Sequence, residues 1–171
     1  IGEPGTGREA FARYLHAGST RAAKQFVAVV AGNLSDSAAE VQLRGRETDK
    51  GVEPGFYQQA AGGTLFINGL DDLSPVVQRL LAADLEAGTY TRVGGRQPLA
   101  LDIRLLSSAQ PGLEQRTAPE PFRRDLLSHL NVLTLRVPPL REYAEDVPEL
   151  LRHYVDRLAD SEGLRLRRFS V

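Results

Sequence analysis

The sequence has 171 residues, of which 42% are hydrophobic and 25% charged, and its formal net charge is −1. These values are ordinary for one well-buried globular domain, and the near-zero charge argues against a whole-chain attraction to nucleic acid or anionic membrane. The absence of cysteine excludes disulfides and cysteine-ligated zinc, and no apolar run approaches the roughly 20 residues of a membrane helix. We therefore expect a soluble, cytoplasmic protein without a membrane partner or a secretory signal.

The chain opens on a glycine-rich loop that resembles a phosphate-binding loop. The loop reads Gly2-Glu3-Pro4-Gly5-Thr6-Gly7-Arg8-Glu9. In the pattern G-x-x-x-x-G-K-[ST], backbone N–H groups and a helix N-terminus surround the β-phosphate, the lysine reaches the β/γ oxygens, and the hydroxyl holds Mg²⁺. Here Arg8 stands at the lysine position and Glu9 at the hydroxyl position. A plain glycine turn, with Arg8 as an ordinary surface arginine, is the alternative.

Four short apolar runs bounded by turn residues predict buried strands. Parallel strands that are covered on both faces show continuous rather than alternating apolarity. The runs are Phe26–Val30, Thr64–Ile67, Leu101–Leu106 and Val132–Val137.

Helical patterns alternate with these runs. Phe11, Tyr14 and Leu15 fall on one face after the glycine loop, and a second helix is predicted after Ser74-Pro75, a cap followed by a first-turn proline. A capping box at 146–149 begins a third helix with an apolar stripe to residue 158. Strands alternating with helices predict a three-layer α/β fold with a mostly parallel sheet.

Two proline-rich segments divide the chain. Residues 110–121 contain three prolines and predict a loop, and Pro138-Pro139 ends the last predicted strand. We predict an α/β core over 1–139 and the incomplete beginning of a helical subdomain over 140–171. The start on the loop without methionine, and the end after a helix, predict a piece of a larger protein.

The run at residues 62–67 leads to a second candidate site. Enzymes with a phosphate-binding loop place the Mg²⁺ carboxylate and the base that polarises water at the end of a hydrophobic strand. This run ends in Asn68 and Gly69 instead. Asp71 and Asp72 follow as either a displaced metal ligand or a solvated acidic pair, and the three histidines lack ligand spacing, so we predict no metal site.

Five motifs in order make the chain similar to one family. They are Gly2–Gly7, Gly62–Phe66, Arg92–Gly95, Phe122–Leu126 and Pro138–Glu142. Together they resemble the AAA+ domain of the bacterial enhancer-binding proteins, the NtrC-type activators of sigma-54 RNA polymerase. The resemblance implies a P-loop NTPase sandwich followed by a helical lid, in a ring-forming ATPase that remodels a promoter complex. It also implies a regulatory domain and a DNA-binding helix-turn-helix outside these residues.

The chain departs from the family at the ATPase positions. The family loop reads G-E-x-G-T-G-K-E, so Glu9 is normal and Arg8 deviates, and arginine is not a conservative replacement for lysine. The family strand ends in Asp-Glu. Asn68 is a poor Mg²⁺ ligand, and Gly69 removes the general base. Val30 stands where the family has the asparagine that holds that glutamate.

Other family sites also differ. Residues 48–54 replace the sigma-contacting G-A-F-T-G-A segment and predict a surface turn rather than a long hairpin. The polar sensor Thr-Asn reads Ala109-Gln110 here. Of the two trans-acting arginines, Arg123 matches the first and His129 occupies the second, where a near-neutral imidazole cannot fully replace a guanidinium.

Three functional hypotheses follow. The first is a degenerate regulator whose central domain is structural or self-associating, binds ATP or ADP weakly, holds Mg²⁺ poorly and contacts sigma-54 doubtfully. The second is a nucleotide sensor without turnover, and the third is a working ATPase with atypical residues.

Overall fold

The computed structural model describes residues 1–115 and 121–162 and divides the chain into two compact units, Ile1–Val137 and the residues from Pro138 onward. The predicted loop at 110–121 and the predicted subdomain at 140–171 therefore lie partly outside the described residues. The assignment of the second unit to a helical lid remains a prediction.

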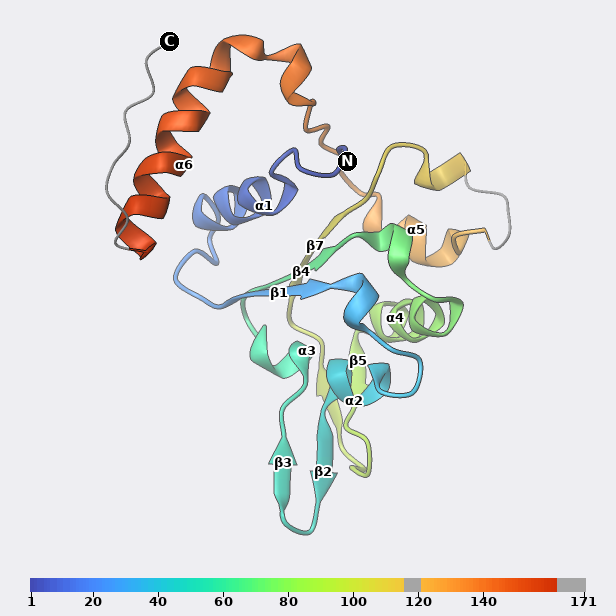
Figure 1. Cartoon of the computed structure of the whole chain (residues 1–171). Coiled ribbons are helices and arrows are strands. Elements are labelled where there is room, and N and C mark those ends of the chain that lie inside the picture. The colour runs from blue at the N-terminus through green and yellow to red at the C-terminus, as the bar shows by residue number, and fades with distance from the viewer. Residues whose placement is uncertain (116–120, 163–171) are drawn as a thin grey trace. The chain divides into compact units, whose positions relative to one another are not determined.

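The first unit contains a three-stranded parallel sheet in the order β1-β4-β7 and two small antiparallel hairpins (Figure 1). The sheet strands are β1 (Phe26–Val30), β4 (Thr64–Asn68) and β7 (Arg104–Ser108), and the hairpin strands are β2 (Arg46–Thr48), β3 (Gly51–Glu53), β5 (Thr89–Thr91) and β6 (Pro98–Ala100). The α-helices are α1 (Arg8–Ala17), α2 (Ala39–Arg44), α3 (Phe56–Gln59), α4 (Pro75–Ala87) and α5 (Arg124–Leu130).

Short 3₁₀ turns complete the first unit, and a single long helix dominates the described part of the second. The turns are Ala31–Asn33, Leu70–Asp72 and Leu113–Gln115 in the first unit, and Leu140–Glu142 and Ala144–Asp146 in the second, before α6 (Val147–Glu162). None of the helices in the described ranges combines the length and apolarity that a bilayer crossing requires.

The core is centred on β4. Leu65, Phe66 and Ile67 are each 0–1% exposed, because α1 lies on one side of the sheet and α4 and α5 lie on the other (Figure 1). The α/β fold with a mostly parallel sheet is thus confirmed. The predicted strands at 26–30 and 64–67 are also confirmed, the second with one further residue, Asn68.

The helix predicted after Ser74-Pro75 is confirmed together with its cap. The Ser74 hydroxyl accepts a hydrogen bond from the Val77 N–H at 3.3 Å, and Pro75 occupies the first helical position. Gly88 ends α4 at φ 61°, in the left-handed region where glycine carries no side-chain penalty.

The helix predicted after the glycine loop is confirmed, but its apolar face does not face the core. Phe11 is 41% and Tyr14 75% exposed, and the buried residues of α1 are Ala12 and His16. His16 Nδ1 lies 2.9 Å from the Thr64 hydroxyl at the start of β4. Ala12 and His16 allow α1 to pack closely on the sheet, and the rings of Phe11 and Tyr14 stay exposed.

The third strand prediction was wrong in part, and the fourth was wrong. The apolar run at 101–106 begins as a connection from β6, and the strand occupies Arg104–Ser108 instead. Residues 132–137 form no strand, and within the described ranges their backbone hydrogen bonds to a distant segment lie near one end. There the Leu135 carbonyl accepts from the Ile1 amine at 2.6 Å and the Val137 N–H donates to the Ile1 carbonyl at 2.7 Å.

The surface turn predicted over 48–54 is instead part of a short hairpin. Strands β2 and β3 pair antiparallel, with Arg46 opposite Glu53 and Thr48 opposite Gly51, and the hairpin projects away from the sheet (Figure 1). Opposite charges facing one another across two strands are favourable, a pairing that composition alone does not indicate.

Gly63 marks a close approach between two segments and supplies a test of the packing. A Cβ at this position would lie 2.2 Å from the Gln25 carbonyl oxygen, which also accepts the Thr64 N–H at 2.9 Å. We expect Gly63→Ala to lower the free energy of unfolding by about 1–3 kcal/mol, as overpacking does, in a urea titration followed by circular dichroism.

Gly18→Ala is the matched control, because its Cβ would meet only the Tyr14 carbonyl at an ordinary 3.6 Å. Equal unfolding midpoints for the two variants would show that the approach at Gly63 is not tight.

Candidate nucleotide-binding site

The glycine loop has the backbone geometry of an anion cradle. Gly5 and Gly7 have φ angles of 83° and 80°, and a Cβ on either would meet nothing within 4 Å. Gly7 is the N-cap of α1, whose first-turn N–H groups have no partner within the helix. Left-handed glycines before a helix N-terminus direct backbone N–H groups at a bound anion.

Hydrogen bonds within the chain hold the first residues of the loop in place. The Gly2 N–H donates to the Ala109 carbonyl at 3.1 Å, and the Thr6 hydroxyl donates to the Glu3 carbonyl at 2.8 Å. A Cβ on Gly2 would lie 2.8 Å from the Thr6 hydroxyl oxygen, so only glycine fits there. The Glu9 carboxylate pairs with Arg13 one turn later at 2.7 Å and so faces along α1.

Arg8, the residue at the lysine position, bonds to the loop itself. Its Nη1 donates to the Gly2 carbonyl at 3.1 Å. A guanidinium carries five N–H donors, so this bond leaves others free to meet an anion, but it holds the group against the start of the loop.

The carboxyl end of β4 is neutral and internally hydrogen-bonded. The Ser108 hydroxyl donates to Asn68 Oδ1 at 2.6 Å and accepts the Gly69 N–H at 3.1 Å. Val30 is the register partner of Asn68 on β1, so the three residues predicted to have lost ATPase chemistry do lie together. The amide oxygen that stands in place of the family's metal carboxylate therefore accepts a hydrogen bond from Ser108.

Gly69 has a backbone that discourages a side chain. Its φ angle is 82°, and a Cβ there would lie 3.2 Å from Asp72 Oδ2. The neighbouring Asp71 accepts the Gln110 N–H at 2.9 Å, which connects the predicted sensor segment to the 3₁₀ turn after β4. Asp71, Asp72 and Gln110 line an open hollow of about 450 Å³. Among the described residues, no group of three or more His, Asp or Glu side chains could hold a metal ion.

Arg123 and His129, the residues at the trans-acting positions, both have partners within this chain. The Arg123 guanidinium pairs with Asp125 and holds the pKa of that carboxyl below its usual range, with the Leu126 N–H adding to the shift. His129 Nε2 lies 3.0 Å from Glu86 Oε2 on α4.

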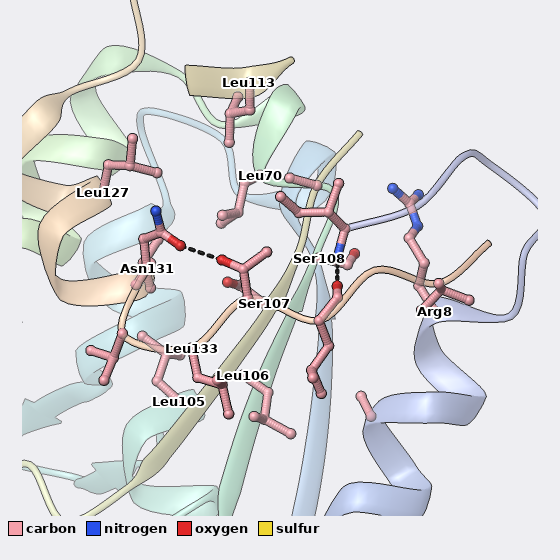
Figure 2. A pocket seen from close by; sticks show the side chains of 18 of the residues that line it. Arg8, Leu70, Leu105, Leu106, Ser107, Ser108, Leu113, Leu127, Asn131 and Leu133 are labelled. Carbon is pink, nitrogen blue, oxygen red and sulfur yellow. Dashed lines mark hydrogen bonds between the residues drawn. The ribbon is translucent and has the colours of Figure 1, made fainter. Parts of the chain in front are cut away.

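A cavity of about 590 Å³ lies beside β7 and is bounded by α1, α5 and residues 131–137. Figure 2 shows Leu105 and Leu106 of β7 near Leu133, with Arg8 on the α1 side. Ile1 bonds to Leu135 and Val137, while Gly2 bonds to Ala109 after β7. This alternation is the bonding pattern of a strand between two parallel neighbours. Arg8 at the start of α1 lines this cavity together with Arg104 of β7 and His129 of α5.

Sequence reasoning missed two polar residues that organise the site. Buried Gln78 on α4 donates to the Leu73 carbonyl at 2.9 Å and accepts the Arg123 N–H at 2.9 Å, which fixes the start of α5. Ser108 is the second. Gln78 is a single glutamine within a helix, so no residue spacing in the sequence indicates its role. Ser107 and Ser108 directly follow the apolar run at 101–106, so the sequence could have indicated polar side chains at the end of a strand.

The comparisons with known proteins show the family of the chain. A family model described as the sigma-54 interaction domain matches residues 1–136. The DNA-binding transcriptional regulator NtrC of Rhizobium meliloti (strain 1021) is 41% identical over 98% of this chain and 36% of its own length. The C4-dicarboxylate transport transcriptional regulatory protein DctD of Pseudomonas aeruginosa is 40% identical over 98% of this chain and 37% of its own length.

Solved structures show the same similarity. NtrX from Brucella abortus in complex with ADP has a TM-score of 0.88 and 32% identity over 99% of this chain, which spans 38% of the NtrX chain. NtrX in complex with ATP also has a TM-score of 0.88 and 32% identity, and this chain spans 39% of it. With its P-loop NTPase-like fold, the chain belongs to the sigma-54 interaction domain family of NtrC-type AAA+ domains.

Proposed function

We propose that the chain is the central domain of a cytoplasmic, NtrC-like transcription regulator that binds ATP or ADP weakly and hydrolyses ATP little or not at all. Its role is structural and self-associating, and gene control depends on DNA binding by a domain outside these residues. The observation that carries the proposal is that the two family carboxylate positions after β4 hold none: Asn68 Oδ1 accepts a hydrogen bond from Ser108, and Gly69 carries no side chain.

Nucleotide binding is supported by the loop. The left-handed Gly5 and Gly7 and the N-terminus of α1 are a fit for a di- or triphosphate, and Arg8 retains a positive charge beside it. Mg²⁺ does not fit in the same way, because the hard cation favours charged oxygen and Asn68 offers an amide that is already hydrogen-bonded. The solved NtrX complexes with ADP and ATP support nucleotide binding in a relative.

Weak or absent sigma-54 contact is supported by the β2–β3 hairpin. It has three residues on each strand and turns at Asp49-Lys50, with no aromatic residue, and its exposed large hydrophobic residue is Val52 at 47%. Interface hot spots are enriched in buried aromatic and arginine anchors, which a short charged tip lacks.

A nucleotide sensor without turnover is the second candidate function. It is favoured by the backbone geometry of the glycine loop. A sensor whose assembly state changes with nucleotide occupancy needs this loop to bind nucleotide, but it does not need the catalytic side chains. A working ATPase with atypical residues is the third.

One experiment separates the three. The purified chain is titrated with ATP and ADP by calorimetry, its assembly state is followed by analytical ultracentrifugation, and phosphate release is measured with Mg²⁺. We expect weak saturable binding, no change of assembly with nucleotide and no phosphate release above the blank. Nucleotide-dependent assembly would favour the sensor, and phosphate release that Arg8→Ala abolishes would overturn the proposal.

Gly7→Val tests whether binding uses the loop. A valine at a φ angle of 80° costs about 1–2 kcal/mol in the bound backbone conformation, so we expect affinity for ADP to fall about tenfold. Gly18→Ala at the other end of α1 is the control and should bind like the unchanged chain. Equal affinities for Gly7→Val and Gly18→Ala would place nucleotide binding elsewhere.

A further inference from the structure

A buried ion pair lies at the base of the β2–β3 hairpin. Asp84 of α4 is 3% exposed in its side chain, and Arg44 is the last residue of α2, directly before the hairpin. Arg44 Nε donates to Asp84 Oδ2 at 3.0 Å and Nη2 donates to Oδ1 at 2.5 Å. This two-pronged contact fixes the direction of the guanidinium as well as its distance.

The segment that follows the second strand of the hairpin lies near the Asp84 carboxylate. Tyr57 lies on α3, directly after the hairpin, and is 2% exposed. Burial, followed by the nearby Asp84 charge, raises the pKa of Tyr57 well above its ordinary value. Both ends of the hairpin therefore lead into helices that contact Asp84 or its immediate surroundings.

Two glycines close the hairpin base. A Cβ on Gly45 would lie 2.5 Å from the Glu53 carbonyl, and a Cβ on Gly55 would lie 2.3 Å from the Gly45 nitrogen. The chain thus crosses itself backbone to backbone where it enters and leaves the hairpin, and this crossing leaves little room for the base to pivot.

The side of the hairpin is held by the loop between β5 and β6. The Glu47 N–H donates to the Val93 carbonyl at 2.9 Å, and the Val93 N–H donates to the Gly45 carbonyl at 3.0 Å. Arg92 adds an ion pair to Glu47 at 3.3 Å and a hydrogen bond to Gln58 of α3 at 2.9 Å. Arg92–Gly95 is one of the five motifs of the family resemblance, and the sequence alone indicated no role for it. In the structure this motif holds β2.

We propose that Asp84 is a positioning residue that, through Arg44, fixes the β2–β3 hairpin in one orientation, and that this orientation is independent of nucleotide at the glycine loop. The named contacts come from α3, α4 and residues 92–95, and none involves residues 2–9 or the β4 end at Asn68 and Gly69. The inference rests on the proposed function only in assuming that nucleotide binds the loop.

Spin labels provide the test, because the 171 residues contain no cysteine. Lys50→Cys at the hairpin turn and Arg79→Cys on the exposed side of α4 are labelled in the full chain, and their distance distribution is measured by pulsed electron resonance. We expect one narrow peak that is unchanged by ATP or ADP. Because the Gly45–Gly55 crossing and residues 92–95 also hold the hairpin, Asp84→Asn should broaden the peak rather than abolish it, while Asp84→Glu should largely restore the narrow peak.

Glu40→Gln is the matched control. Glu40 pairs with the same guanidinium at 2.7 Å, but its side chain is 56% exposed, and exposed pairs contribute little. The single peak should survive this change. If Asp84→Asn does not fold, Arg44→Lys keeps the charge, removes the two-pronged contact and should also broaden the peak.

The outcomes separate the two proposals. An unchanged single peak in Asp84→Asn or in Arg44→Lys would overturn the positioning role, and a nucleotide-dependent peak in the unchanged chain would overturn the independence. Phosphate release with an unchanged peak would contradict the proposed function and leave this inference standing.

Discussion

Asp84→Asn lowers the free energy of unfolding by about 3–5 kcal/mol, the range for removing one partner of a buried ion pair. The carboxylate is 3% exposed, and the change leaves the Arg44 guanidinium without its buried charge partner. Because Arg44 itself is 20% exposed and also contacts Glu40, we expect a value toward the lower end. Urea unfolding at low salt measures it, since guanidinium chloride would screen the charges.

A double variant shows what the pair contributes relative to apolar packing. Replacing a whole buried pair by hydrophobic residues of similar volume is often neutral or stabilising, so Arg44→Met/Asp84→Leu should recover most of the loss. Glu40→Gln should change the stability by less than about 1 kcal/mol. If the double variant were as unstable as Asp84→Asn, the decrease in the free energy of unfolding would come from poorer packing at these positions rather than from an unpaired charge.

The same pair shows which parts of the fold the sequence could predict. The apolar runs that became β1 and β4 were recognisable because both are continuous, and the Ser74-Pro75 cap was recognisable from local chemistry. The Arg44–Asp84 contact joins residues 40 positions apart, and neither has a local pattern that requires a partner. A polar contact between distant residues depends on how the helices pack in the folded chain, which local sequence patterns do not give.

Two other failures have the same origin. Residues 132–137 have strand composition, but a strand also needs a hydrogen-bonded neighbour along its length, and composition carries no information on neighbours. The buried side of α1 did not follow from hydrophobicity, because Phe11 and Tyr14 are more hydrophobic than Ala12 and His16 and yet more exposed. The small pair is buried instead, since His16 finds a hydrogen-bond partner in Thr64.

Much of the candidate site was predictable, because motif spacing fixes which residues belong together. The positions of Asn68 and Val30 at one strand end follow from parallel pairing. The conformation of Gly69 did not follow, because glycine is compatible with every backbone region. That conformation determines the second large effect expected here.

Introducing the family's acidic side chains with Asn68→Asp/Gly69→Glu should not produce ATP hydrolysis. A positioned general base contributes about 10²–10⁴-fold to rate, but only when its geometry is correct. At φ 82° a glutamate is strained, and its Cβ lies 3.2 Å from Asp72 Oδ2, so it begins against another carboxylate. We expect phosphate release with Mg²⁺ to stay at the blank and the stability to fall by about 1–2 kcal/mol.

Asn68→Asp alone is the control, since it changes the charge beside Ser108 without straining the backbone, and its stability should stay close to that of the unchanged chain. If the double variant gained turnover by about 10²-fold or more, the loss of hydrolysis would lie in two side chains alone. If it stays inactive and is destabilised, side chains at these two positions are not sufficient for hydrolysis, as expected where a side chain at Gly69 is strained and Arg8 and His129 also depart from the family pattern.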